Sequence, residues 1–115
     1  MNGAEKVAET QVATTAPEGS PELGAALEEA KRLICGDRRA DYGGVEESFT
    51  DVAQAWSILF DTTVTPEQVA LAMVLLKVFR EKRKHKHDNL VDIAGYAGLA
   101  DFMAELKLFK SSIRT

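Results

Sequence analysis

Acidic and amide side chains recur along one face of a predicted helix near the C-terminus. Asn89, Asp92 and Tyr96 are spaced three and four residues apart, so a helix places them on one stripe, and Asp88 adjoins its start. Oxygen ligands of this kind suit Mg²⁺, which binds a few carboxylates together with water and substrate phosphates. In the structural alternative, Asp88 only caps the helix and Asp92 only complements its first turns.

Two cations stand at the end of the preceding apolar segment. Lys77 and Arg80 are three residues apart, and Lys84 continues the same face. A lysine inside a run of Val, Leu and Phe either extends its ammonium group to the surface or pairs with an acid. Two alternatives stay open: Lys77 and Arg80 bind phosphate oxygens opposite Asp92, or one of them forms a structural ion pair with Asp92.

Two further segments offer ligands. Residues 36–44 combine both signs of charge with glycines and an aromatic ring, so Arg38 is a candidate for gripping a phosphate and Tyr42 for stacking on a base. A solvated turn with internal Asp–Arg pairs is the alternative. Glu47 and Asp51 share a face of the next predicted helix and are candidate magnesium ligands, although acids in a first turn often only complement the helix dipole.

The composition bounds the class of protein. The chain has 115 residues, 45% of them hydrophobic and 28% charged, which is enough for one domain with a modest core. The single Cys35 indicates a reducing compartment. No apolar stretch is long enough to span a bilayer, and no signal peptide is visible. We therefore expect a cytoplasmic protein with no membrane partner. The net charge of -4 argues against nucleic-acid binding, although residues 80–87 carry a local net charge of +4.

Hydrophobic periodicity predicts an all-α, four-helix bundle-like domain over residues 21–115, preceded by a disordered N-terminal tail over residues 1–20. The first helix is expected to start with Ser20 as N-cap and to end at Gly36 in a left-handed cap. The second is expected over 45–60. The fourth is expected to begin after Asp88 as N-cap, and residues 102–115 either extend it or fray.

The third predicted helix has the clearest start signal. Thr65 and Gln68 form a capping-box pattern around Pro66. Apolar residues then cover nearly every direction of the helix up to Phe79, so we expect this helix to be central and the most buried. Because one chain of this size has few helices to cover it, we also expect a homo-oligomer, a dimer or a tetramer.

Three strings in this order resemble a small family of phage and prophage proteins of unassigned role over residues 23–104. The strings are GDRRADYGGVEESFTDVAQAW, TPEQVALAMVLLKVFRE and DNLVDIAGYAGLADF. More distantly, the helical layout and Asp92 followed by Tyr96 resemble the MazG-like all-α nucleoside triphosphate pyrophosphatases. Those enzymes hold magnesium with a Glu-x-x-Glu and a Glu-x-x-Asp motif. Here Asn89 replaces the second motif's Glu, and Lys77 and Arg80 stand where carboxylates are expected.

The resemblance implies a phage-derived protein that handles a nucleotide, with magnesium-dependent pyrophosphohydrolysis as the enzymatic form. In that form Asp92 and Asp88 would be the catalytic acids, and an acid from the second helix would complete the metal site. Lys77, Arg80 and Arg38 would neutralise the phosphates. The alternative is a non-catalytic module that binds a nucleotide or a host protein, which the incomplete set of carboxylates favours.

Overall fold

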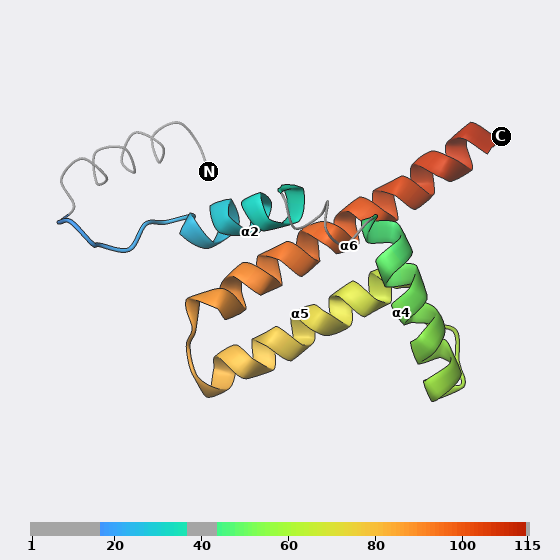
Figure 1. Ribbon diagram of the computed structural model, residues 1–115, viewed down its shortest axis with the longest axis horizontal. Helices are drawn as coiled ribbons and strands as arrows, with labels where there is room; N and C mark the ends of the chain where they lie inside the picture. The colour runs from blue at the N-terminus through green and yellow to red at the C-terminus, as the bar shows by residue number, and fades with distance from the viewer. Residues whose placement is uncertain (1–16, 37–43, 115) are drawn as a thin grey trace.

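The computed structural model describes residues 17–36 and 44–114 of the chain. These residues form four helices and no strand: α2 (Ala25–Cys35), α4 (Val45–Phe60), α5 (Pro66–Arg83) and α6 (His87–Arg114). α5 and α6 form an antiparallel hairpin, α2 lies along the first part of α6, and α4 crosses the open end of the hairpin (Figure 1). The all-α prediction is confirmed, while residues 1–16 of the predicted tail lie outside the described residues. No helix in the described ranges is long and apolar enough to cross a membrane.

Small side chains hold the hairpin together. Ala70 on α5 is fully buried against Ala100 and Met103 on α6. Half-buried Phe49 and Val45 of α4 pack against the same cluster, so one core joins α4, α5 and α6. Alanine at a helix contact lets two backbones approach closely, and this contact fixes which residues face each other along the hairpin.

α2 packs on α6 where α6 carries glycines. A Cβ atom at Gly98 would lie 3.3 Å from Ile34 Cδ1, and one at Gly95 would lie 3.6 Å from Ile34 Cγ2. The side chain of Ile34 therefore occupies the space that larger residues would fill. Glycine at each position destabilises the helix by about 1 kcal/mol relative to alanine. The absence of a side chain there allows α2 to approach α6 closely.

The first helix ends at Gly36 as predicted, but its predicted start and the left-handed conformation of that glycine are wrong. α2 begins at Ala25 after Gly24, whose φ of 93° is left-handed, so Ser20 does not cap it. Leu23 is 85% exposed and has no packing that would hold an extra turn. At the other end Gly36 is extended, with φ -98° and ψ -151°, rather than left-handed. A Cβ atom there would lie 2.5 Å from the carbonyl oxygen of Arg32, which explains the need for glycine.

The connection between α4 and α5 follows the sequence signals. α4 spans the predicted 45–60, and the capping box of α5 is complete: Gln68 N donates to Thr65 Oγ1 (3.2 Å) and Thr65 N donates to Gln68 Oε1 (2.9 Å). Ser57 Oγ donates to the Ala53 carbonyl (2.7 Å) and accepts from Val64 N (2.9 Å). These bonds close the turn and set the start of α5.

The expectation that the third helix is the most buried is wrong. Among the described residues of α5, only Val69 and Ala70 are buried. Its side facing away from α6 has no neighbour in the described chain, and Phe79 on that side is 63% exposed. An apolar surface all around a helix requires neighbours on several sides, but α6 covers one side and α4 covers only the start of α5.

We expect Thr65→Ala to lower the free energy of unfolding by about 1 kcal/mol, because the N-cap oxygen that accepts the Gln68 amide is lost. Chemical denaturation followed by circular dichroism measures the change. Thr63→Ala, in the exposed turn before the cap, is the matched control and should change stability little. Equal losses in both variants would contradict the capping role.

Candidate functional site

An ion pair joins the two arms of the hairpin. Lys77 Nζ on α5 lies 2.9 Å from Asp92 Oδ2 on α6, and the side chains are 18% and 35% exposed. The structural ion pair, one of the two alternatives for these residues, is therefore present. Both charged groups still reach solvent, so the pair is accessible to a ligand at the edge of the contact between α5 and α6. We call this edge the seam, defined by Lys77, Arg80 and Asp92.

Uncompensated positive charge adjoins the pair. Arg80 follows Lys77 by three residues on α5 and is exposed. Within the described part of the chain Arg80 has no ion pair, and neither does Lys84, which follows the end of α5 in an extended conformation and so does not continue the helix face. Lys77 and Arg80 carry one more charge than Asp92 within the seam, while the exposed carboxylate of Asp88 lies one helical turn before Asp92 on α6.

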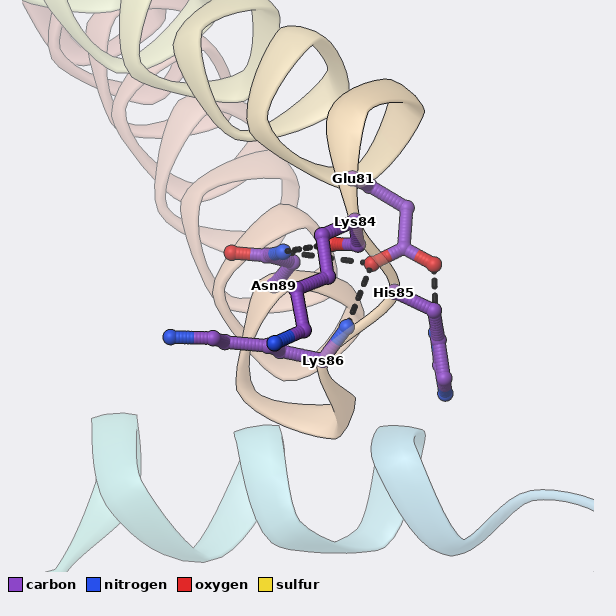
Figure 2. Close-up of polar contacts among 5 residues, drawn as sticks. All are labelled: Glu81, Lys84, His85, Lys86 and Asn89. Carbon is purple, nitrogen blue, oxygen red and sulfur yellow. Dashed lines mark hydrogen bonds and ion pairs between the residues drawn. The ribbon is translucent and has the colours of Figure 1, made fainter.

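A second polar cluster holds the closed end of the hairpin. Figure 2 shows His85, Lys86 and Asn89 around the carboxylate of Glu81. Glu81 Oε1 accepts from Lys86 N (3.0 Å) and from Asn89 Nδ2 (3.2 Å), and Oε2 pairs with His85. Asn89 is 7% exposed, so this bond satisfies a buried amide. We call Glu81, His85, Lys86 and Asn89 the hairpin cluster.

The electrostatics of the cluster favour an ionised Glu81. The hydrogen bond from the Lys86 backbone amide is the main reason that the pKa of Glu81 lies below its ordinary value, and bonds from His85 and Asn89 act in the same direction against partial burial. Sequence reasoning missed Glu81. The signal was an acid four residues before His85 within an otherwise basic run.

The second histidine of the basic segment links α2 to the hairpin. His87 Nε2 lies 2.7 Å from Glu29 Oε2, which is 58 residues earlier in the chain. Each histidine of the segment therefore contacts one carboxylate, that of Glu81 for His85 and that of Glu29 for His87. This contact and the packing of Ile34 hold α2 beside the start of α6.

The other predicted residues of the fourth helix have separate environments. α6 begins at His87, so Asp88 lies exposed in its first turn and the prediction that it is the N-cap is wrong. Asn89 turns inward to Glu81. Tyr96 packs edge to face on Phe49 of α4, with ring centroids 6.4 Å apart and planes at 78°. The accessible acids on this part of α6 are therefore Asp88, which is exposed, and Asp92, which is partly exposed.

The remaining candidates that the structure describes, Glu47 and Asp51, form no metal-binding group with Asp92. Glu47 and Asp51 lie exposed on α4. Arg38 and Tyr42 lie outside the described residues. A groove of about 340 Å³ lies between the starts of α4 and α5 and the later part of α6, where Lys110 Nζ pairs with Glu46 at 2.6 and 2.9 Å. Along α5 the groove begins about 15 Å from Lys77, since each helical residue rises about 1.5 Å.

The predicted magnesium ligands come from two helices, α4 and α6. Among the residues that the structure describes, no group of three or more His, Cys, Asp or Glu side chains is placed to hold a metal ion. The carboxylate of Asp92 is also taken by Lys77. The predicted ligands do not gather into such a group among the described residues; they are Asp88, Asp92, Glu47 and Asp51.

We expect Glu81→Gln to lower the melting temperature at neutral pH and to flatten its pH dependence. Because the pKa of Glu81 is lowered by folding, its contribution is present above the ordinary value of 4.5 and is lost as the pH falls through the folded-state pKa. Thermal unfolding between pH 7 and pH 3 measures this. Glu105→Gln, an exposed acid on α6, is the control. A Glu81→Gln deficit that stays constant at every pH would contradict the charge effect.

Two curated phage proteins are similar to the chain. Gene 55 protein of Mycobacterium phage D29 is 40% identical over 80 residues, which cover 69% of this chain and 53% of that protein. Gene 55 protein of Mycobacterium phage L5 is 40% identical over 79 residues, covering 67% and 51%. The chain thus spans about half the length of these relatives. No solved structure matches it, and the MazG-like resemblance stays a prediction.

Residues 25–104 match a family described as a domain of unknown function, DUF6378. The match begins with α2 and ends within α6, so it includes the seam and the hairpin cluster. Its bounds agree closely with the 23–104 expected from the three sequence strings. The phage-family resemblance is therefore confirmed, and the chain belongs to the DUF6378 family of small phage proteins.

Proposed function

We propose that this protein handles a nucleotide by binding its phosphate groups at the seam around Lys77, Arg80 and Asp92. The observation that supports this most is the ion pair itself. It places a partly accessible ammonium group and carboxylate from two helices 2.9 Å apart, near Arg80, which has no ionic partner among the described residues. An anion with several negative charges is the ligand that such a surface favours.

The binding step is an exchange of partners. A partly exposed ion pair is worth only about 0–1 kcal/mol, so opening it costs little. A nucleoside di- or triphosphate carries more negative charge than one carboxylate, and the Lys77 ammonium has three donors to share between Asp92 and phosphate oxygens. Arg80, one turn further along α5, adds a planar fork that suits phosphate. Asp92 then competes with the ligand for Lys77.

Hydrolysis is not part of this proposal. The described acids form no group of three or more around one point, so the proposal rests on phosphate binding by Lys77 and Arg80. Pyrophosphohydrolysis of the MazG-like kind is therefore a result to be measured beside binding. The second candidate function, a non-catalytic module that binds a nucleotide or a host protein, is favoured by the incomplete set of carboxylates, with Asn89 in the place of an acid.

The test is isothermal titration calorimetry with nucleoside mono-, di- and triphosphates, with and without Mg²⁺, together with phosphate-product analysis. We expect Lys77→Met to weaken binding about 10- to 100-fold, since a hydrogen bond to a charged group contributes about 1.5–3 kcal/mol. Without Mg²⁺, Asp92→Asn should strengthen binding, because a competing negative charge is removed. The controls are Lys31→Met on α2 and Asp101→Asn on α6, both exposed.

A charge exchange separates binding from stability. The double variant Lys77→Glu, Asp92→Lys restores an ion pair across the seam, so it should recover stability lost in the single variants. Nucleotide affinity should not recover, because an acid then stands beside Arg80. Recovery of both would assign the pair a purely structural role. Failure of every nucleotide to bind the wild type would refute the proposal, and turnover with Mg²⁺ would show the enzymatic form.

A further inference from the structure

The side of α5 that faces away from α6 is an exposed apolar stripe. Leucine, valine and phenylalanine recur there at helical spacing, each between 44% and 63% exposed. The stripe ends at exposed Gln68 toward the N-terminus and exposed Lys82 toward the C-terminus. We call it the outer face; its large apolar residues are Leu71, Leu75, Val78 and Phe79, with Leu76 at its margin.

The chain's own core is small for four helices. The buried hydrophobic residues of the described ranges are mainly alanines, and no large side chain there is less than 2% exposed. A domain of this size depends on burying most of its apolar surface. We therefore expect the outer face to be covered in the folded protein, and a second copy of the same chain is a partner that is present wherever the protein is made.

The order of residues on the outer face suits pairing with itself. Leu75 lies at its centre, and the stripe extends seven residues to Gln68 and seven to Lys82. In an antiparallel pair about Leu75, Phe79 meets the partner's Leu71, and Lys82 meets the partner's Gln68. The result is an apolar centre with a polar rim, which is the usual composition of a protein interface.

Charge selects the antiparallel arrangement. The last turn of α5 carries Arg80, Lys82 and Arg83. Parallel pairing would bring these cations against the same cations of the partner, and their helix dipoles would also be parallel. Antiparallel pairing separates the two basic ends and opposes the dipoles. Like-charge repulsion is thereby avoided without any change in the apolar contact.

We propose that the protein is a two-fold symmetric dimer in which the outer face of α5 packs antiparallel on the outer face of the partner's α5, with Leu75 at the axis. Leu75 and the seam pair Lys77–Asp92 lie on different sides of α5, since Lys77 faces α6. Loss of nucleotide binding and loss of the dimer are therefore separate results.

Sedimentation velocity of the full chain tests this. We expect about twice the chain mass of 12.6 kDa for the wild type. Leu75→Glu and Leu75→Lys should each halve the observed mass, because a residue at the axis meets its own copy and like charges then face each other. A mixture of the two variants should regain the dimer, since Glu then faces Lys. Such a rescue would show that each single variant is folded and that it lost the dimer through charge repulsion at the contact, not through misfolding.

The matched control uses Leu108 on α6, which is 65% exposed but lies on another helix. Leu108→Glu and Leu108→Lys should both stay dimeric. A wild-type mass of one chain would overturn the proposal. A dimer that survives both Leu75 variants would also overturn it, because the contact would then lie elsewhere. If the mixture of the two Leu75 variants stays monomeric, Leu75 does not face its own copy and the proposed axis is wrong.

Discussion

The close antiparallel contact between α5 and α6 is the constraint on which the rest of the structure depends. Ala70 and Ala100 let the two backbones approach, and the short connection held by Glu81 sets the register. α2 and α4 pack on this hairpin from different sides. Because the register is fixed at both the core and the turn, Lys77 and Asp92 are brought face to face although they are 15 residues apart in sequence.

Polar residues between α5 and α6 divide by accessibility. Asn89 is buried and satisfied by Glu81, so it stabilises the turn and is poorly placed to meet a ligand. Lys77 and Asp92 are paired but remain in reach of solvent, and such a pair opens at little cost. The same boundary between α5 and α6 therefore contains a rigid part that holds the geometry and an exchangeable part that is suited to a charged ligand.

The outer face of α5 shows how a short chain distributes its hydrophobic surface. The helix contacts α6 on one side through small residues, and its larger leucines and phenylalanine point the other way. A core that lies half within one chain and half between two chains would reconcile the alanine-rich interior with the number of large apolar residues. It also leaves the seam free at the side of the hairpin.

The sequence by itself determined the features that depend on neighbouring residues. The capping box at Thr65, the extent of α4 and the all-α class were predicted correctly because local hydrogen bonds and hydrophobic spacing specify them. The start of α2 was predicted wrongly. The capping signal at Ser20 had no packing to support it, and Gly24 allowed a left-handed turn instead. Sequence reasoning also raised the pairing of Lys77 with Asp92 as an alternative.

Tertiary structure alone decided the partners and the burial. Periodicity identifies an apolar helix but not which of its sides the same chain covers, so the exposure of Leu75 in particular became visible only in the fold. Glu81 gained its role only when the chain turned back on itself at Lys86. The acids Glu47 and Asp51 stay apart from Asp92 because α4 crosses the open end of the hairpin, a consequence of long-range packing that residue spacing does not encode.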